Sequence, residues 1–170
     1  MTRLSKLSRS IDGKIAIITG AASGMGRATA LLFADEGAKV VVIDLNVNSV
    51  NAVVSEITAR YGADAAVGFA LDVCRTQEVT AMVESVVQMY GGVDIVINNA
   101  GITIPKLLLD LSDEDWENVV DTNLKGVAFV TREAAKRMIA ADVGGSVINI
   151  ASILAVRVQS MLSNYAAAKA

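Results

Sequence analysis

The sequence predicts an α/β fold with a doubly wound parallel sheet. Short apolar runs such as "IAII" and "VVVI" are typical of strands buried on both faces of a parallel sheet. Five such runs alternate with helix-like stretches, which indicates βαβ units joined in one sheet. The length of 170 residues fits one domain large enough to bury a core.

The first half of the chain contains three strand–helix units. "KIAIITG" (14–20) is the first strand, and an alanine-rich amphipathic stretch over about 24–36 is the helix after it. "KVVVIDL" (39–45) is the second strand, followed by a helix over about 48–60. "AVGFALDV" (66–73) is the third strand, and it precedes a helix near 76–90.

The second half repeats the pattern with a longer helix. "VDIVINNAG" (93–101) is the fourth strand, and a loop joins it to a helix near 113–140. Ser112 followed by three acidic residues is a plausible helix start, while Gly126 indicates local irregularity inside the helix. "GSVINIAS" (145–152) is the fifth strand, followed by a loop and a short final helix.

Composition and charge exclude several classes of protein. The net charge is −3, so no broad basic surface for nucleic acid is expected. No apolar run approaches the ~18 residues that cross a bilayer, so we expect no membrane partner. Cys74 is the single cysteine, which fits a reducing cytoplasm. Histidine is absent, which argues against a Ser-His-Asp triad and most zinc sites, so no metal site is expected.

The first strand runs directly into the turn "TGAASGMG", which begins with Thr19 and lies at the mouth of a helix. Glycines let the backbone approach a pyrophosphate, and helix N–H groups favour its charge. We therefore expect a dinucleotide cofactor here, although a Gly-rich turn can also be purely structural. The expected cofactor-binding residues in this turn are Gly20, Ser23, Gly24, Met25 and Gly26, of which Met25 also fits a packing role.

Two carboxylates follow the next two strands. Asp44 ends the second strand 18 residues after Gly26, where it can accept hydrogen bonds from both ribose hydroxyls and repel a 2′-phosphate. This favours NAD over NADP. Asp72, with Val73 beside it, is placed for the adenine edge, although an aspartate that forms a turn before a helix fits equally well.

Together these residues resemble the short-chain dehydrogenase/reductase family in its classical form. "TGAASGMG" is similar to the family's TGxxxGxG loop, and "NNAG" (98–101) is similar to its motif after the fourth strand. The resemblance covers the chain from about residue 11 and implies a Rossmann-like sheet with strand order 3-2-1-4-5. The side chains in the order of the family's catalytic tetrad are Asn123, Ser152, Tyr165 and Lys169.

The resemblance implies a role for each of these side chains in the interconversion of an alcohol and a ketone. Tyr165 would be the acid/base, and Lys169, one helical turn later, would supply the positive charge and bind the nicotinamide ribose. Tyr165 and Lys169 are both counted among the cofactor-binding residues as well. Ser152 would orient the substrate oxygen, and Asn123 would hold a water of a proton relay.

The "NNAG" motif allows two roles. Asn99, Ala100 and Gly101 are assigned to the cofactor. A role in shaping the backbone behind the cofactor fits Asn98 and Gly101 equally well, and a bond to neighbouring backbone fits Thr19.

The family normally continues beyond the lysine with two more strands. We therefore expect residues 1–10 to be a flexible tail and 11–170 to be a C-terminally incomplete domain that lacks the last strands, with the fifth strand as a bare edge and a final helix of about two turns. The full-length form is expected to be a homo-oligomer.

Two alternatives to an active dehydrogenase or ketoreductase stay open. A catalytically silent dinucleotide-binding fragment would bind NAD without turnover. A nucleotide-sugar epimerase also uses a Tyr–Lys pair, but its loop is usually spaced TGxxGxxG. "NNAGIT" is similar to 3-oxoacyl-carrier-protein reductases, yet such strings occur across the family, so the substrate stays open.

Overall fold

The structure is a computed structural model that describes residues 10–142 and 144–170. The predicted tail therefore lies outside the described residues, except for Ser10. Five parallel strands form one sheet in the order β3-β2-β1-β4-β5, which confirms the predicted fold class. The strands are β1 (Ile15–Thr19), β2 (Lys39–Asp44), β3 (Ala66–Ala70), β4 (Ile95–Asn98) and β5 (Ser146–Asn149).

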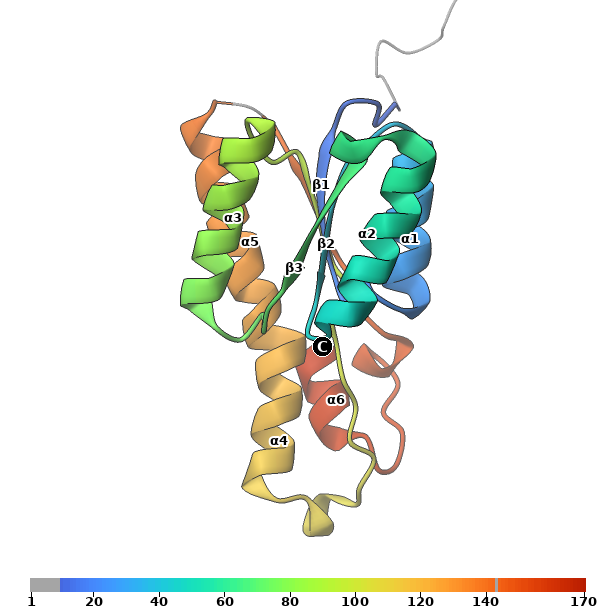
Figure 1. The fold of residues 1–170 in the computed structure, drawn as a ribbon. Helices are drawn as coiled ribbons and strands as arrows, with labels where there is room; N and C mark the ends of the chain where they lie inside the picture. Colours follow the sequence, from blue (N-terminus) through green and yellow to red (C-terminus); the bar gives the residue numbers. More distant parts are fainter. Residues whose placement is uncertain (1–9, 143) are drawn as a thin grey trace, which may run out of the picture.

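Helices cover both faces of this sheet. α1 and α2 lie on one face, and α3 and α5 lie on the other (Figure 1). α4 and α6 lie beyond the carboxyl ends of the strands, next to each other. Among the described residues, no helix is long and apolar enough to cross a membrane. The helices are α1 (Gly24–Asp35), α2 (Val47–Tyr61), α3 (Thr76–Tyr90), α4 (Asp113–Val120), α5 (Gly126–Ala140) and α6 (Ser163–Lys169).

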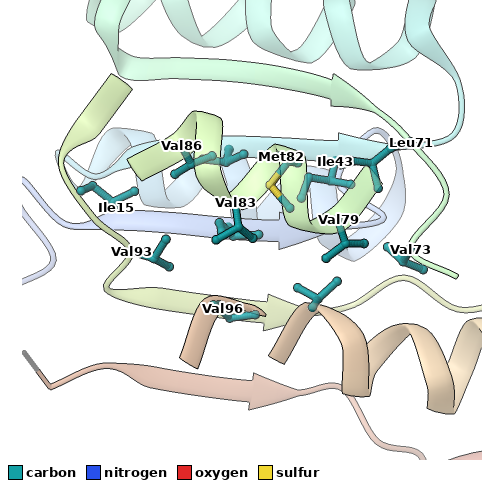
Figure 2. Packing of buried hydrophobic residues seen from close by; sticks show 14 of the residues in the cluster. Ile15, Ile43, Leu71, Val73, Val79, Met82, Val83, Val86, Val93 and Val96 are labelled. Carbon is teal, nitrogen blue, oxygen red and sulfur yellow. The ribbon is translucent and has the colours of Figure 1, made fainter. Parts of the chain in front are cut away.

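Two apolar clusters hold the layers together, one on each side of the sheet. Alternate residues of each strand point to opposite faces, so Ile17 joins the cluster under α3 and α5 while Ile18 joins the one under α1 and α2. This two-sided burial is why the strands read as continuous apolar runs. Figure 2 shows how α3 packs its apolar face, Val79, Met82, Val83 and Val86, onto the sheet.

The predicted helix over 113–140 is interrupted. α4 begins at a capping box. The Ser112 side chain accepts from the Asp115 backbone N–H, and the Asp115 side chain accepts from the Ser112 backbone N–H. The chain then passes through a π-helical segment, Asp121–Lys125, before α5 continues. The expected irregularity is therefore present, and it contains Asn123.

All five strands end earlier than their apolar patterns predict. β1 and β2 end one residue early, and the other three strands end three residues early, at Ala70, Asn98 and Asn149 instead of residues 73, 101 and 152. After each of these points the chain leaves the ladder for turns that face the carboxyl edge of the sheet. β5 pairs only with β4 among the described residues, and all four of its residues are exposed, so the expected bare edge is observed.

Candidate active site

A cavity of about 490 Å³ lies at the carboxyl edge of the sheet, beside the glycine turn. It has walls from the turn, the ends of β2 and β3 and the segment after β4. Ten of the predicted cofactor-binding residues line it: Gly20, Ser23, Gly24, Met25, Asp44, Asp72, Val73, Asn99, Ala100 and Gly101.

Gly26 lies beneath the turn and lines neither this cavity nor the next one. A Cβ at this position would be 2.1 Å from the Gly20 carbonyl oxygen and 2.5 Å from Asn99 Nδ2. Only glycine therefore lets the first turn of α1 approach the end of β1 so closely. Its contribution to the cavity is the shape of the turn.

The segment after β4 is tied to the end of β1 by side-chain hydrogen bonds. Thr19 Oγ1 accepts from the backbone N–H groups of Asn99 and Ala100, at 3.1 and 3.0 Å. Asn99 Nδ2 donates to the carbonyl oxygens of Thr19 and Gly20, both at 3.0 Å. Thr19 thus binds neighbouring backbone, the second of the two roles that the sequence left open.

Asn98 points away from the cavities, into the space between β4, β5 and α5. Its Nδ2 donates to Asn149 Oδ1 at 2.8 Å and to Thr131 Oγ1 at 2.9 Å. The residue is 2% exposed and lines neither cavity. Its role in this structure is therefore to shape the strands behind the site.

Asp44 holds the glycine turn from the end of β2. Its Oδ2 accepts from the Ala22 N–H at 3.1 Å, and its Oδ1 accepts from the Leu45 N–H at 2.8 Å. A carboxylate has about four acceptor sites, so both oxygens keep capacity for a ligand. The carboxylate therefore lies on the cavity wall while it also orders the turn.

Asp72 lies two residues beyond the end of β3 and forms a turn. Its Oδ1 accepts from the Cys74 N–H at 2.9 Å, and its Oδ2 lies 4.0 Å from Arg75 Nε. The same residue lines the cavity. Both of the roles that the sequence allowed for Asp72 are therefore compatible with its position.

A second cavity, of about 760 Å³, continues from the first. The two share the wall residues Met25, Asn99, Gly101 and Ile102. All four predicted tetrad residues, Asn123, Ser152, Tyr165 and Lys169, line the second cavity. Asn123 comes from the π-helical segment, Ser152 from the loop after β5, and the other two from α6. The fold therefore brings together side chains that are up to 46 positions apart in the sequence.

Tyr165 and Lys169 share one face of α6. Lys169 Nζ lies 5.9 Å from the centroid of the Tyr165 ring. The same Nζ donates to the Ile150 carbonyl oxygen at 2.7 Å, which holds the ammonium at the end of β5. Burial lowers the pKa of Lys169 below its ordinary value of 10.5, because desolvation penalises the charged form.

Ser152 and Asn123 flank this pair. Ser152 Oγ accepts from the Leu154 N–H at 3.1 Å, which leaves its own proton available to a ligand. Asn123 Nδ2 donates to the carbonyl oxygens of Ile102 and Val119, both at 2.8 Å. Asn123 Oδ1 is buried and has no hydrogen-bond partner among the described residues.

Gly101 makes room for the Asn123 amide. A Cβ on Gly101 would lie 2.5 Å from Asn123 Oδ1 and 3.6 Å from Lys169 Nζ. The absence of a side chain thus keeps the second cavity open where the unpaired amide oxygen lies.

Sequence reasoning missed several wall residues. Thr122 and Asn118 reach the first cavity from the helical segment that also carries Asn123. The available signal was their spacing from each other, because polar residues four positions apart lie on one face of a helix. The apolar wall of the second cavity carried no signal of function: Ile102, Pro105, Ile150, Ile153, Leu154, Met161 and Leu162.

Comparisons with known proteins agree with this geometry. A family model described as short chain dehydrogenase matches residues 14–170. The 3-oxoacyl-[acyl-carrier-protein] reductase FabG of Thermotoga maritima is 41% identical over 160 residues, which are 94% of this chain and 64% of that protein. D-threitol dehydrogenase of Mycolicibacterium smegmatis is 37% identical over 142 residues, 84% of this chain and 54% of that protein.

A solved structure shows the same fold. A protein from Sinorhizobium meliloti 1021, assigned as a short-chain alcohol dehydrogenase, superposes with a TM-score of 0.86 at 30% identity, over 93% of this chain and 62% of the other. The chain therefore spans 54–64% of the length of these three proteins.

Proposed function

Because this chain belongs to the short chain dehydrogenase family, we propose that it is an oxidoreductase that interconverts an alcohol and a ketone with NAD(H). One observation supports this most directly: Asn123, Ser152, Tyr165 and Lys169 line one cavity. That cavity shares a wall with the cavity beside the glycine turn, so a dinucleotide that occupies the turn can reach the four side chains.

The residues of the first cavity fit a dinucleotide. The turn before α1 brings backbone N–H groups and the positive end of a 12-residue helix to the place for a pyrophosphate. Asp44, on the wall at the end of β2, would accept hydrogen bonds from ribose hydroxyls and repel a 2′-phosphate. The nicotinamide, when bound, supplies or accepts the hydride.

The protein would manage the proton. In the reductive direction Tyr165 donates its phenolic proton to the substrate oxygen, and in the oxidative direction the phenolate accepts it. A phenol has an ordinary pKa near 10, so it needs a nearby cation, and Lys169 provides one from the same helix face. Ser152 would donate its free proton to the same oxygen and orient it. The unpaired Asn123 Oδ1 would accept from a water beside the pair.

The walls of the second cavity favour a ketone with an apolar substituent over a polyol. Apolar side chains from three segments line it, including Ile102, Leu154 and Met161. Burying polyol hydroxyls against them without partners is costly. We therefore propose a 3-oxoacyl compound as the substrate class.

Turnover and binding measurements test the proposal. NADH and NADPH are titrated by fluorescence, and oxidation of NADH is followed with a 3-oxoacyl thioester, while D-threitol is assayed with NAD⁺. We expect NADH to bind more tightly than NADPH and the thioester to be reduced. Absence of binding of either dinucleotide would refute the proposal, and turnover of D-threitol alone would overturn the substrate class.

Replacing the acid/base isolates its role. Tyr165→Phe should lower turnover by about 10²–10⁴-fold, the range for a general acid, and leave the NADH affinity within about twofold because the ring remains. Lys169→Ala should lower both the turnover and the NADH affinity. Tyr90→Phe is the matched control, because Tyr90 ends α3 and lines neither cavity. Near-normal turnover of Tyr165→Phe would show that another group moves the proton.

A further inference from the structure

We propose that Asn164 is a positioning residue that fixes the backbone of Tyr165 against α4. The inference rests on the proposed function, since it concerns the residue that would move the proton. Asn164 is 0% exposed, although its side chain is an amide. Burying an amide costs free energy unless its polar atoms form hydrogen bonds, and both the oxygen and the nitrogen of this amide do so.

The oxygen of the amide caps α6 in place of the usual residue. The first backbone N–H groups of a helix have no partner within the helix, and a side chain at the N-cap position ordinarily accepts from one of them. In α6 the N-cap position is occupied by Leu162, whose side chain has no acceptor. Asn164 Oδ1 instead accepts from the Tyr165 N–H, at 2.8 Å.

The nitrogen of the amide joins this helix start to its neighbour. Asn164 Nδ2 donates to the Asp115 carbonyl oxygen of α4, at 3.4 Å. α4 and α6 lie side by side beyond the sheet (Figure 1). One side chain therefore links α4 to the backbone nitrogen of Tyr165.

α4 is well anchored where Asn164 binds it. The Asp115 carboxylate accepts from the Ser112 N–H at 3.1 Å and from Lys106 Nζ at 2.5 Å. The Lys106 backbone N–H in turn donates to the Met161 carbonyl oxygen at 3.0 Å. The two loops that wall the second cavity and the start of α6 are thus fastened to the same turn of α4.

This anchorage matters because α6 is short. A helix of seven residues has little stability of its own, and its first turn depends on caps and packing. Without the Asn164 bonds, the Tyr165 N–H loses its partner and the first turn of α6 is free to unwind. A displacement of about 1 Å at a reacting group can lower a rate a hundredfold.

Amide exchange of Tyr165 and turnover, measured on the same variants, test the proposal. Asn164→Leu removes both hydrogen bonds at similar size, and Asn164→Asp keeps the acceptor for the Tyr165 N–H. Ala167→Gly is the matched control, because Ala167 is exposed and glycine weakens α6 without removing either bond. In the wild type we expect the Tyr165 amide to be protected from exchange to a similar degree as the Ala166 amide, which donates to the Leu162 carbonyl oxygen.

The expected results separate positioning from general stability. Asn164→Leu should exchange the Tyr165 amide at least tenfold faster and lower kcat at least tenfold, while the NADH affinity stays within threefold. Asn164→Asp should restore protection of the Tyr165 amide to within about fivefold of the wild type, because it keeps the acceptor, while kcat should recover only in part, because the donor to the Asp115 carbonyl oxygen is lost. Equal losses in Ala167→Gly and Asn164→Leu would overturn the proposal, as would an unprotected Tyr165 amide in the wild type.

The proposed function can fail separately. A wild-type chain without turnover refutes that function, while the exchange of the Tyr165 amide still decides whether Asn164 orders it.

Discussion

Asp44 uses both carboxylate oxygens on the protein itself, although the sequence singles it out as a ligand contact. One oxygen holds the Ala22 N–H of the glycine turn, and the other holds the Leu45 N–H that follows β2. At the residue scale, therefore, the same group orders the turn and, under the proposed function, would also bind the cofactor. A substitution that removes the charge but keeps an acceptor can separate these two roles.

Asp44→Asn should narrow the preference for NADH over NADPH, and Asp44→Ala should narrow it further. The asparagine keeps an acceptor oxygen but no longer repels a 2′-phosphate. The alanine has neither the acceptor oxygen nor the repulsive charge. For Asp44→Ala we expect the difference between the NADH and NADPH binding free energies to decrease by about 1–3 kcal/mol, the cost of losing a charged hydrogen-bond partner. Fluorescence titration of both cofactors measures it, and tighter NADPH binding in the wild type would contradict the assignment.

Gly26→Ala should destabilise the protein and impair cofactor binding together. The new Cβ would lie 2.1 Å from the Gly20 carbonyl oxygen, so the turn must shift. Overpacking of this kind costs about 1–3 kcal/mol. Urea unfolding and NADH titration give the two values. Gly92→Ala is the control, since a Cβ there meets nothing within 4 Å, and an unaltered NADH affinity in Gly26→Ala would show that the turn tolerates the shift.

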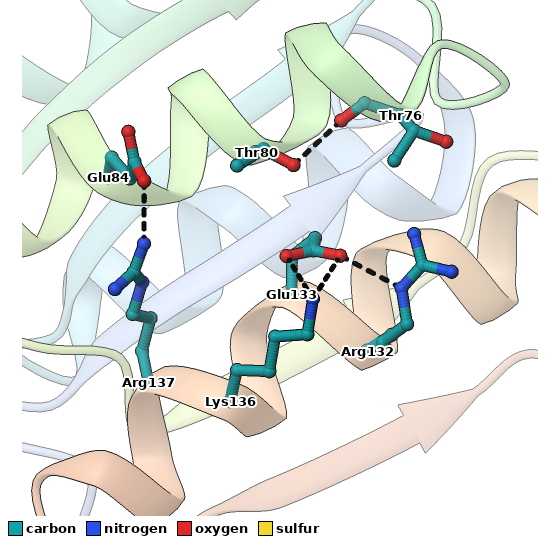
Figure 3. A network of polar contacts seen from close by, with 7 residues as sticks. All are labelled: Thr76, Thr80, Glu84, Arg132, Glu133, Lys136 and Arg137. Atoms are coloured by element: carbon teal, nitrogen blue, oxygen red, sulfur yellow. Dashed lines mark hydrogen bonds and ion pairs between the residues drawn. The ribbon is translucent and has the colours of Figure 1, made fainter.

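At the scale of elements, α3 and α5 are joined by charged side chains as well as by the apolar core. Arg137 of α5 bonds Glu84 of α3 at 2.7 Å, and on α5 the Glu133 carboxylate accepts from Arg132 and Lys136 (Figure 3). Glu133 is only 6% exposed, so these two cations and not water stabilise its negative charge. The hydrogen bond from Arg132, followed by that from Lys136, lowers the pKa of Glu133 below its ordinary value of 4.5, against the opposing effect of burial.

This lowered pKa predicts a stability that depends on pH. A carboxylate whose pKa is lower in the folded state stabilises that state above its unfolded pKa, and the contribution disappears as the pH falls through the folded pKa. Glu133→Gln should therefore lower the free energy of unfolding at pH 7, by about 1 kcal/mol because both partners are half-exposed. The difference from wild type should shrink below pH 4.5, as urea titrations at both pH values would show. Glu84→Gln is the control, because Glu84 is an exposed carboxylate of the same network, and a difference independent of pH would contradict the assignment.

At the scale of the whole molecule, the described sheet has two edge strands, β3 and β5, and β5 is the more exposed of the two. β5 pairs with β4 on one side, and within the described residues no strand pairs with its other side. Val147 and Ile148 are 38% and 46% exposed on this strand. Exposed apolar edge strands offer unpaired backbone groups to other chains, so a purified chain of these 170 residues is expected to associate through this edge.

Val147→Lys should reduce that association and leave the fold intact. A lysine on an edge strand opposes pairing with a second edge, and Val147 is not part of either buried cluster. Light scattering on the wild type and the variant measures the change in mass. Val158→Lys, which changes an 80% exposed residue away from the sheet, is the control for added charge alone. Identical masses of wild type and Val147→Lys would show that β5 is not the contact.

Local sequence was sufficient for the features that depend on neighbouring residues. The strand–turn–helix order, the cap at Ser112 and the shared face of Tyr165 and Lys169 follow from periodicities and spacings of a few residues, and each is observed. The identity of the family followed from motifs that carry those local patterns. The roles of the predicted site residues stay predictions.

Only the tertiary structure decided the features that depend on contacts between distant segments. Asn99 binds the end of β1 across about 80 positions, Asn164 binds α4 across 49, and the early ends of the strands depend on where a neighbour stops pairing. Such contacts are set by the packing of layers and leave no periodic trace near either residue. The apolar wall of the second cavity could not be predicted for the same reason. In the sequence, an apolar residue of a core cannot be distinguished from one that lines a binding site, and only the fold places these residues beside Tyr165.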